Sequence, residues 1–160
     1  MACSHWRAER RCRAGLALLL VAALAACGPG RRGSDPPLGA TGRQTAHGLP
    51  ELRNPFAGDA AASAAGAQIY AQRACVTCHG NKLTGAMCPS LVNQRWVYGD
   101  DDTTLFFLLR DGSVALRGHG YTRSGQDPQV GDMAGFGRLL DDHELWQLVS
   151  FVRAQQLRAD

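Results

Sequence analysis

Cys75-Val76-Thr77-Cys78-His79 forms a C-x-x-C-H motif in this 160-residue chain. The spacing brings two thiols close together on one turn of backbone, with an imidazole directly beside the second thiol. Two such thiols can each add to one vinyl group of a haem, and the adjacent imidazole can then bind the iron. The motif therefore predicts one covalently bound haem c, with Cys75 and Cys78 as thioether residues and His79 as an axial iron ligand.

Two other uses of a C-x-x-C pair fit the remaining sequence less well. A redox dithiol is typical of a thioredoxin-like βαβ pattern, which the sequence lacks. A zinc site needs a second pair of ligands, and only Cys88 lies nearby. Because haem c is attached outside the cytoplasm, the haem interpretation also requires an exported chain.

The first 26 residues have the layout of a secretory signal. Arg10, Arg11 and Arg13 precede an apolar stretch of 12 residues, GLALLLVAALAA, at positions 15–26. A membrane-spanning helix needs about 20 apolar residues, and a buried core helix would carry polar residues at helical spacing, which this stretch does not. We therefore expect residues 1–26 to be a signal peptide.

The signal ends in Leu24-Ala25-Ala26-Cys27, which resembles the lipobox of bacterial lipoproteins. The resemblance implies that Cys27 is lipidated and becomes the new N-terminus. Two or more acyl chains suffice for stable anchoring, so we expect a periplasmic protein held to the outer or the inner membrane. The alternative is an ordinary signal peptide that is cut nearby and leaves Cys27 as a free thiol.

Residues 27–58 are rich in glycine and proline and almost free of aromatic residues. Such a segment cannot bury enough apolar surface to offset the entropy lost on ordering. We therefore expect a flexible tether over 27–58 and one domain over residues 59–160.

The charge distribution excludes a nucleic-acid-binding protein. The formal net charge is +3, and residues 1–26 carry all of it. After Cys27 the acidic and basic residues are equal in number, so no basic stripe remains to bind phosphates.

Residues 60–157 resemble the class I cytochromes c. Gly66 and Tyr70 lie on an alanine-rich stretch that favours helix. In that family a glycine and an aromatic residue at these places pack against the C-terminal helix. The resemblance implies an all-α cytochrome c fold with three main helices around one haem, long loops and little or no sheet.

The loop after the motif extends the resemblance. Gly80, Gly85, Pro89 and Leu91 fit the family's pattern, whereas Cys88 stands where a glycine is common. The family implies that the Pro89 carbonyl accepts a hydrogen bond from the proximal imidazole, which fixes the ring. We expect Cys88 to be buried and inert, as free cysteines usually are, with pairing to another molecule as the alternative.

Four residues could supply the second axial ligand: Met87, Met133, His119 and His143. Met87 follows His79 too closely to reach the other face of the ring, and His143 belongs to the polar first turn of the last helix. Met133 lies in a glycine-rich loop before an aromatic residue and a helix, which resembles the class I distal loop. His119, in the flexible stretch RGHG, remains the rival.

The choice between Met133 and His119 matters for the reduction potential. A thioether ligand raises the potential relative to a second imidazole. Family members usually have proline after this methionine, and this chain has Ala134 instead, so we expect a less rigid loop.

Two helices are predicted after the motif. One begins at residues 102–104 and is stopped by Asp111-Gly112. The last begins with a capping box of Asp141 and Glu144 and continues as an apolar stripe with helical spacing from Leu145.

Trp96 and Tyr98 precede the first of these helices. A buried tryptophan or tyrosine needs a partner for its N–H or O–H group, and haem propionates are suitable acceptors. Some cytochromes that serve periplasmic dehydrogenases have a similar W-x-Y stretch. We therefore predict that Trp96 and Tyr98 surround the haem, with core packing alone as the alternative.

Together these features predict a monohaem electron carrier that cycles between Fe(III) and Fe(II). Its partners would be a redox protein donor and a redox protein acceptor, such as a dehydrogenase or a respiratory complex. No enzymatic activity and no small-molecule substrate are expected. The alternative is a haem enzyme or small-ligand binder, peroxidase-like or binding a diatomic gas, with an open distal site.

Overall fold

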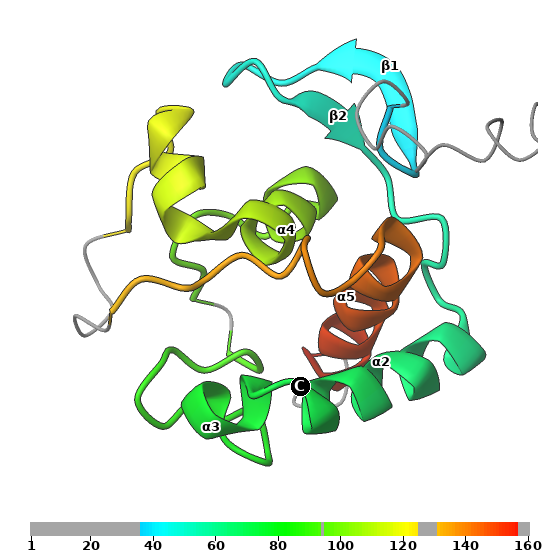
Figure 1. Cartoon of the computed structure of the whole chain (residues 1–160), viewed down its shortest axis with the longest axis vertical. Helices are drawn as coiled ribbons and strands as arrows, with labels where there is room; N and C mark the ends of the chain where they lie inside the picture. Colours follow the sequence, from blue (N-terminus) through cyan, green and yellow to red (C-terminus); the bar gives the residue numbers. More distant parts are fainter. Residues whose placement is uncertain (1–35, 94, 125–130, 157–160) are drawn as a thin grey trace, which may run out of the picture. The chain divides into compact units, whose positions relative to one another are not determined.

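The computed structural model describes residues 36–93, 95–124 and 131–156, and in it the C-x-x-C-H motif forms a short helix at one edge of a mainly helical fold (Figure 1). In chain order the elements are β1 (Ala40–Gln44), β2 (Pro50–Leu52), α2 (Ala60–Gln72), α3 (Cys75–His79), α4 (Asp102–Gly118) and α5 (Asp142–Gln156). None of the described helices has the length and apolar character needed to cross a membrane. The predicted signal peptide and Cys27 lie outside the described residues.

Helix α2 packs against α5 at the place that the sequence predicted. The side chain of Asp59 caps α2 by accepting hydrogen bonds from the backbone N–H groups of its first turn. The ring of Tyr70 lies 5.4 Å from that of Phe151 on α5. A Cβ atom at Gly66 would lie only 2.0 Å from the carbonyl oxygen of Gln147. Glycine is therefore what lets the two helix backbones approach this closely.

Gly66→Ala should separate these helices and lower the free energy of unfolding by about 1–3 kcal/mol, the usual cost of overpacking. Gly118→Ala is a matched control, since a Cβ atom at this helical glycine would meet nothing within 4 Å. Chemical denaturation of both haem-loaded variants measures the difference. Equal stabilities would show that the close approach at Gly66 does not limit the packing.

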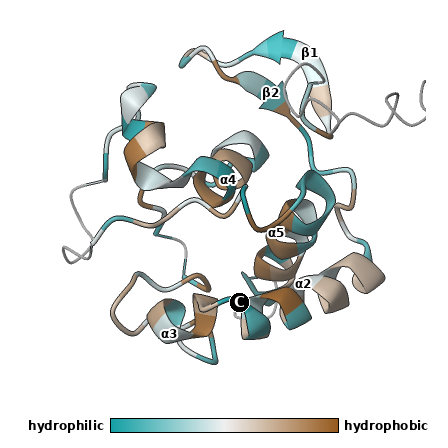
Figure 2. Cartoon of the chain, in the orientation of Figure 1, coloured by the Kyte–Doolittle hydropathy of each residue, from teal (hydrophilic) through white to brown (hydrophobic). Residues whose placement is uncertain are grey.

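Helix α5 confirms the predicted capping box. The Glu144 backbone N–H donates to the Asp141 carboxylate at 2.9 Å, and the Asp141 N–H donates to the Glu144 carboxylate at 3.0 Å. Apolar residues gather on α5 and on the first half of α4 (Figure 2). The buried core on these helices comprises Leu105, Phe106, Phe107, Leu145, Trp146, Leu148 and Val149.

Helix α4 continues beyond the predicted stop. Gly112 has non-helical backbone angles (φ 85°, ψ 171°), so the Asp111-Gly112 signal does break the first helical segment, but the chain resumes helix as far as Gly118. A Cβ atom at Gly112 would lie 2.7 Å from the Met133 carbonyl oxygen. The kink therefore gives the Met133 loop room to cross α4.

The predicted flexible tether over residues 27–58 is wrong for residues 36–58. These residues belong to the same folding unit as the helices. Strands β1 and β2 pair antiparallel, with Ala40 opposite Leu52 and Gln44 opposite Pro50. The domain thus begins well before residue 59, and the mainly helical fold carries a small two-stranded sheet.

Contacts with distant residues explain why this segment folds. The buried indole of Trp146 donates a hydrogen bond to the Leu38 carbonyl at 2.7 Å, and the Leu52 N–H donates to the Thr103 hydroxyl at 2.8 Å. Leu49 and Leu52 are both buried in the core. These partners lie on α4 and α5, so local composition could not reveal them.

Candidate cofactor site

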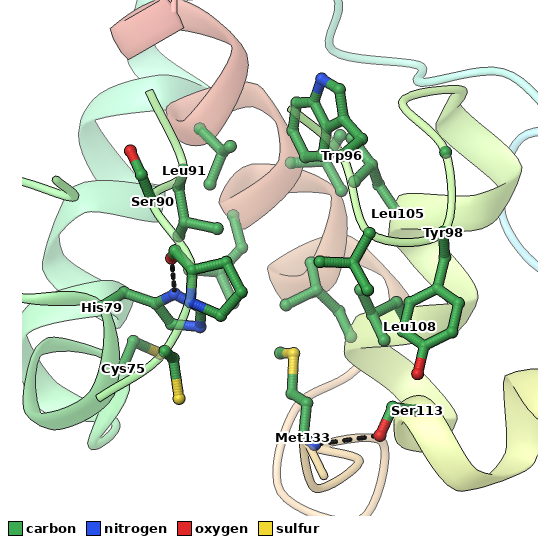
Figure 3. A pocket seen from close by; sticks show the side chains of 18 of the residues that line it. Cys75, His79, Ser90, Leu91, Trp96, Tyr98, Leu105, Leu108, Ser113 and Met133 are labelled. Atoms are coloured by element: carbon green, nitrogen blue, oxygen red, sulfur yellow. Dashed lines mark hydrogen bonds between the residues drawn. The ribbon is translucent and has the colours of Figure 1, made fainter. Parts of the chain in front are cut away.

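A largely apolar cavity lies between the C-x-x-C-H segment and the wall formed by α4, α5 and the Met133 loop (Figure 3). It contains about 1040 Å³ of space, including the part that opens to solvent. Its apolar lining includes Leu91, Leu105, Leu108, Leu109, Val149 and Val152. An apolar lining with a few polar groups suits a mainly apolar cofactor.

His79 lines this cavity with its ring held by a hydrogen bond. Its Nδ1 lies 2.8 Å from the Pro89 carbonyl oxygen. Because a carbonyl can only accept, Nδ1 carries a proton, and in the neutral ring Nε2 then has the free lone pair. This is the hydrogen bond that the resemblance to class I cytochromes implied. It fixes the plane of the imidazole and makes Nε2 a better metal ligand.

The two motif cysteines lie on the short helix α3. Ala74, in a left-handed conformation (φ 50°), turns the chain sharply from α2 into α3. Cys75 lines the cavity, and its thiol donates to the Arg73 carbonyl at 3.1 Å. Burial raises the pKa of the Cys75 thiol. Cys78 is half-buried on the same turn.

Cys88 adds a third free thiol beside the motif. Its backbone N–H donates to the Cys78 carbonyl at 3.1 Å, and its side chain lines the cavity. It is half-buried rather than fully buried, and burial raises its pKa to about 11. No group of three or more metal-binding acidic, cysteine or histidine side chains occurs among the described residues. The zinc alternative therefore gains no support there.

Met133 lies on the wall opposite His79, with its sulfur directed into the cavity (Figure 3). Both backbone groups of Met133 are bound to Ser113 of α4. The Met133 N–H donates to the Ser113 hydroxyl at 3.0 Å, and the Ser113 N–H donates to the Met133 carbonyl at 3.0 Å. The thioether is thus attached to a rigid element through its own backbone.

The other three candidate ligands do not line the cavity. Met87 is 63% exposed. His119 is exposed at the end of α4, where its carbonyl lies 3.2 Å from the Nδ1 atom of His47. His143 is exposed, with its ring against the edge of Phe56 at 4.7 Å. Met133 is the one candidate of the four that faces His79.

Trp96 and Tyr98 line the cavity, as the sequence suggested. The Tyr98 hydroxyl accepts a hydrogen bond from Arg117 at 3.0 Å. Its own proton therefore remains available for another acceptor, such as a carboxylate. The Arg153 guanidinium lies 5.8 Å from the centre of the Trp96 ring.

Sequence reasoning missed Tyr70, Arg95 and Arg123 as cavity residues. The Tyr70 hydroxyl donates to the Gly80 carbonyl at 2.7 Å, which fastens the end of α3 to α2, and burial raises the pKa of Tyr70 to about 12. Arg95 and Arg123 bring positive charge to an otherwise apolar lining. Arg95 directly precedes the W-x-Y stretch, and this position could have identified Arg95 as a residue of the cavity lining.

These residues fit a haem c. The cavity combines an imidazole with a free Nε2, a motif thiol on the same wall, a thioether sulfur on the opposite wall and apolar side chains between them. Arginine side chains at its lining can bind the carboxylates of such a cofactor.

Residues 61–152 match the protein family described as cytochrome c oxidase, cbb3-type, subunit III. This chain belongs to that family of c-type cytochromes. Its cofactor is one covalently bound haem c. Both the class I resemblance and the predicted cofactor are thereby confirmed.

Individual relatives match parts of the cytochrome. The cbb3-type cytochrome c oxidase subunit FixP of Bradyrhizobium sp. (strain ORS 278) is 40% identical over 57 residues, which are 34% of this chain and 19% of that relative. The cytochrome thus matches about a fifth of FixP.

Two solved structures resemble the cytochrome, each with a TM-score of 0.48. Cytochrome cL of Methylophaga aminisulfidivorans is 23% identical, and the match covers 64% of this chain and 58% of that one. Cytochrome cL of Hyphomicrobium denitrificans is 22% identical, with 63% and 51% covered.

Proposed function

We propose that this cytochrome is a carrier with a closed iron site, in which His79 and Met133 are the axial ligands and Cys75 and Cys78 form the thioether bonds. One observation carries the proposal: the Met133 sulfur and the His79 imidazole face each other across the same apolar cavity (Figure 3). With both axial positions filled by the chain, no site is left for a substrate.

The haem supplies a one-electron Fe(III)/Fe(II) couple when it is bound. The chain's own residues determine how that couple behaves. Pro89 holds the His79 ring in one orientation through the hydrogen bond to Nδ1. Leucine and valine side chains make most of the lining apolar, and a thioether ligand favours the reduced state, so the potential should be high.

The alternative is a haem protein with an open distal site, and carbon monoxide separates the two. The absorption spectrum of the reduced protein should not change at neutral pH when carbon monoxide is added, because Met133 occupies the position that the gas needs. A rapid, complete shift of the spectrum would instead favour the ligand binder or enzyme.

We further propose that the carrier acts at a periplasmic membrane surface, anchored through lipidated Cys27. The support is the lipobox-like sequence at the end of the predicted signal. Cys27→Ser should move the protein from the membrane fraction to the soluble fraction and leave its haem spectrum unchanged, since every cavity residue lies at or beyond Tyr70. Fractionation and mass spectrometry of the wild type test this; an unmodified Cys27 in soluble protein would refute the anchor.

The partners we propose are redox proteins, one donor and one acceptor, with the carrier as partner or subunit of an oxidoreductase. The family match, and FixP as a named oxidase subunit, support an acceptor of the cbb3-type oxidase class. Membranes that contain such an oxidase should oxidise the reduced cytochrome in the presence of oxygen. No oxidation above the rate in oxidase-deficient membranes would argue against this acceptor.

A further inference from the structure

We propose that Arg117 is a positioning residue for the Met133 ligand: it holds the Met133 loop in place by joining Asp132 to Tyr98. The inference rests on the proposed ligation of the iron by Met133. It concerns what keeps that sulfur at the iron, and not which residue supplies the ligand.

One guanidinium group makes all three contacts. Its Nη1 and Nη2 atoms donate to the two oxygens of Asp132 at 2.6 and 3.1 Å, which is a two-pronged ion pair. The same Nη1 donates to the Tyr98 hydroxyl at 3.0 Å. Asp132 directly precedes Met133, and Tyr98 lines the cavity beside it. Arg117 therefore connects the ligand loop with a second segment of the cavity wall.

Ser113 transmits this contact to Met133. Its hydroxyl is buried, at 2% exposure of the residue. The hydroxyl donates to the Asp132 carboxylate at 3.1 Å and accepts from the Met133 N–H at 3.0 Å. Asp132 is thus bound from two sides by α4, and the same serine fixes the backbone of the ligand residue.

The loop needs such contacts because its own backbone is permissive. Ala134 follows the ligand residue, so φ at that position is not fixed by a proline ring. Gly131 precedes Asp132 and leaves the backbone before the ligand permissive, whereas Gly135 and Gly137 already lie close against α4. A single exposed ion pair would contribute little, but this one has two-pronged geometry and a buried serine beside it. The polar contacts of Asp132 with Arg117 and Ser113 supply a restraint at this point of the loop.

Arg117→Gln removes the positive partner of the Arg117–Asp132 ion pair, and Asp132→Asn removes its negative partner. In both oxidised, haem-loaded variants we expect added imidazole to displace the sulfur ligand on the order of tenfold more readily than in the wild type, the usual effect of losing one charge-assisted hydrogen bond. The sulfur-to-iron charge-transfer band should also disappear at a lower temperature. Arg117→Lys keeps the positive charge but cannot make the two-pronged contact. Its affinity for imidazole should therefore lie between that of the wild type and that of Arg117→Gln.

Arg43→Gln is the matched control. It breaks the Arg43–Glu51 ion pair of 3.1 Å in the hairpin, neither residue of which lines the cavity, and should leave imidazole affinity unchanged. A merely structural role of Arg117 would lower the stability to denaturant without changing imidazole affinity under folding conditions.

The results separate the inference from the function on which it rests. If the wild type shows the charge-transfer band and both Arg117→Gln and Asp132→Asn bind imidazole with wild-type affinity, the role of Arg117 is wrong and ligation by Met133 stands. If the wild type lacks the band, ligation by Met133 fails, and the inference fails with it.

Discussion

Cys75→Ala/Cys78→Ala should produce a chain from which acid and organic solvent extract all of the haem, whereas the wild type should retain all of it. Each thiol forms one bond to the cofactor, so the double variant has none left. Each single variant should keep its haem through the remaining bond, with the absorption bands shifted by the unreacted vinyl group. Absorbance of the extracted protein, together with its mass, measures the result.

The double variant should also be far less stable. A ligand bound only by the folded state stabilises that state by mass action. A covalent link keeps the haem attached to the chain, so this stabilisation is not lost by dissociation. When the unlinked haem dissociates, the apolar cavity between α3 and the opposite wall is left empty, and the side chains of the two walls lose their contacts with the cofactor. We expect the midpoint of chemical denaturation to fall well below that of either single variant.

Cys88→Ala is the control for this experiment, because Cys88 lines the same cavity but stands outside the C-x-x-C-H motif. It should keep its haem through extraction. Loss of haem from Cys88→Ala, or its complete extraction from the wild type, would contradict the assignment of Cys75 and Cys78.

Local signals in the sequence predicted the parts of the fold that local interactions determine. The capping box of Asp141 and Glu144 depends on residues three apart, and both of its hydrogen bonds are present. The glycine at position 66 was recognised from its spacing to Tyr70, and it does lie against α5. The hydrogen bond between His79 and Pro89 spans ten residues and was also anticipated, through the family resemblance.

Interactions between distant residues account for what the sequence did not reveal. The hairpin of β1 and β2 is stabilised by partners on α4 and α5, up to 108 residues away, so its glycine- and proline-rich composition was misleading. Helix α4 resumes after Gly112 because the Met133 loop crosses at that glycine, 21 residues further along the chain. Arg117 carried no recognisable motif, and its role emerges only when Asp132 and Tyr98 are seen on either side of it.

Met133→Ala should change the cytochrome from a closed carrier into a ligand binder. Alanine offers no sulfur, and the position opposite His79 is then open. The charge-transfer band of the oxidised protein should disappear completely, and the reduced protein should bind carbon monoxide stoichiometrically, where the wild type binds none. The reduction potential should fall, because a thioether stabilises Fe(II) relative to water or a second imidazole. Absorption spectra and a redox titration measure all three effects.

His119→Ala is the decisive comparison, and it should leave the band, the potential and the carbon monoxide response unchanged. The His119 N–H donates to the carbonyls of Ala115 and Leu116, at 3.2 and 3.0 Å, and so closes the last turn of α4. Bringing its exposed ring to the iron would require that turn to unwind, while Met133 already faces His79 across the cavity. If the His119 variant nevertheless loses its low-spin spectrum and the Met133 variant keeps it, the iron has two histidine ligands. The carrier would then work at low potential, and the last turn of α4 would have to unwind in the haem-bound protein.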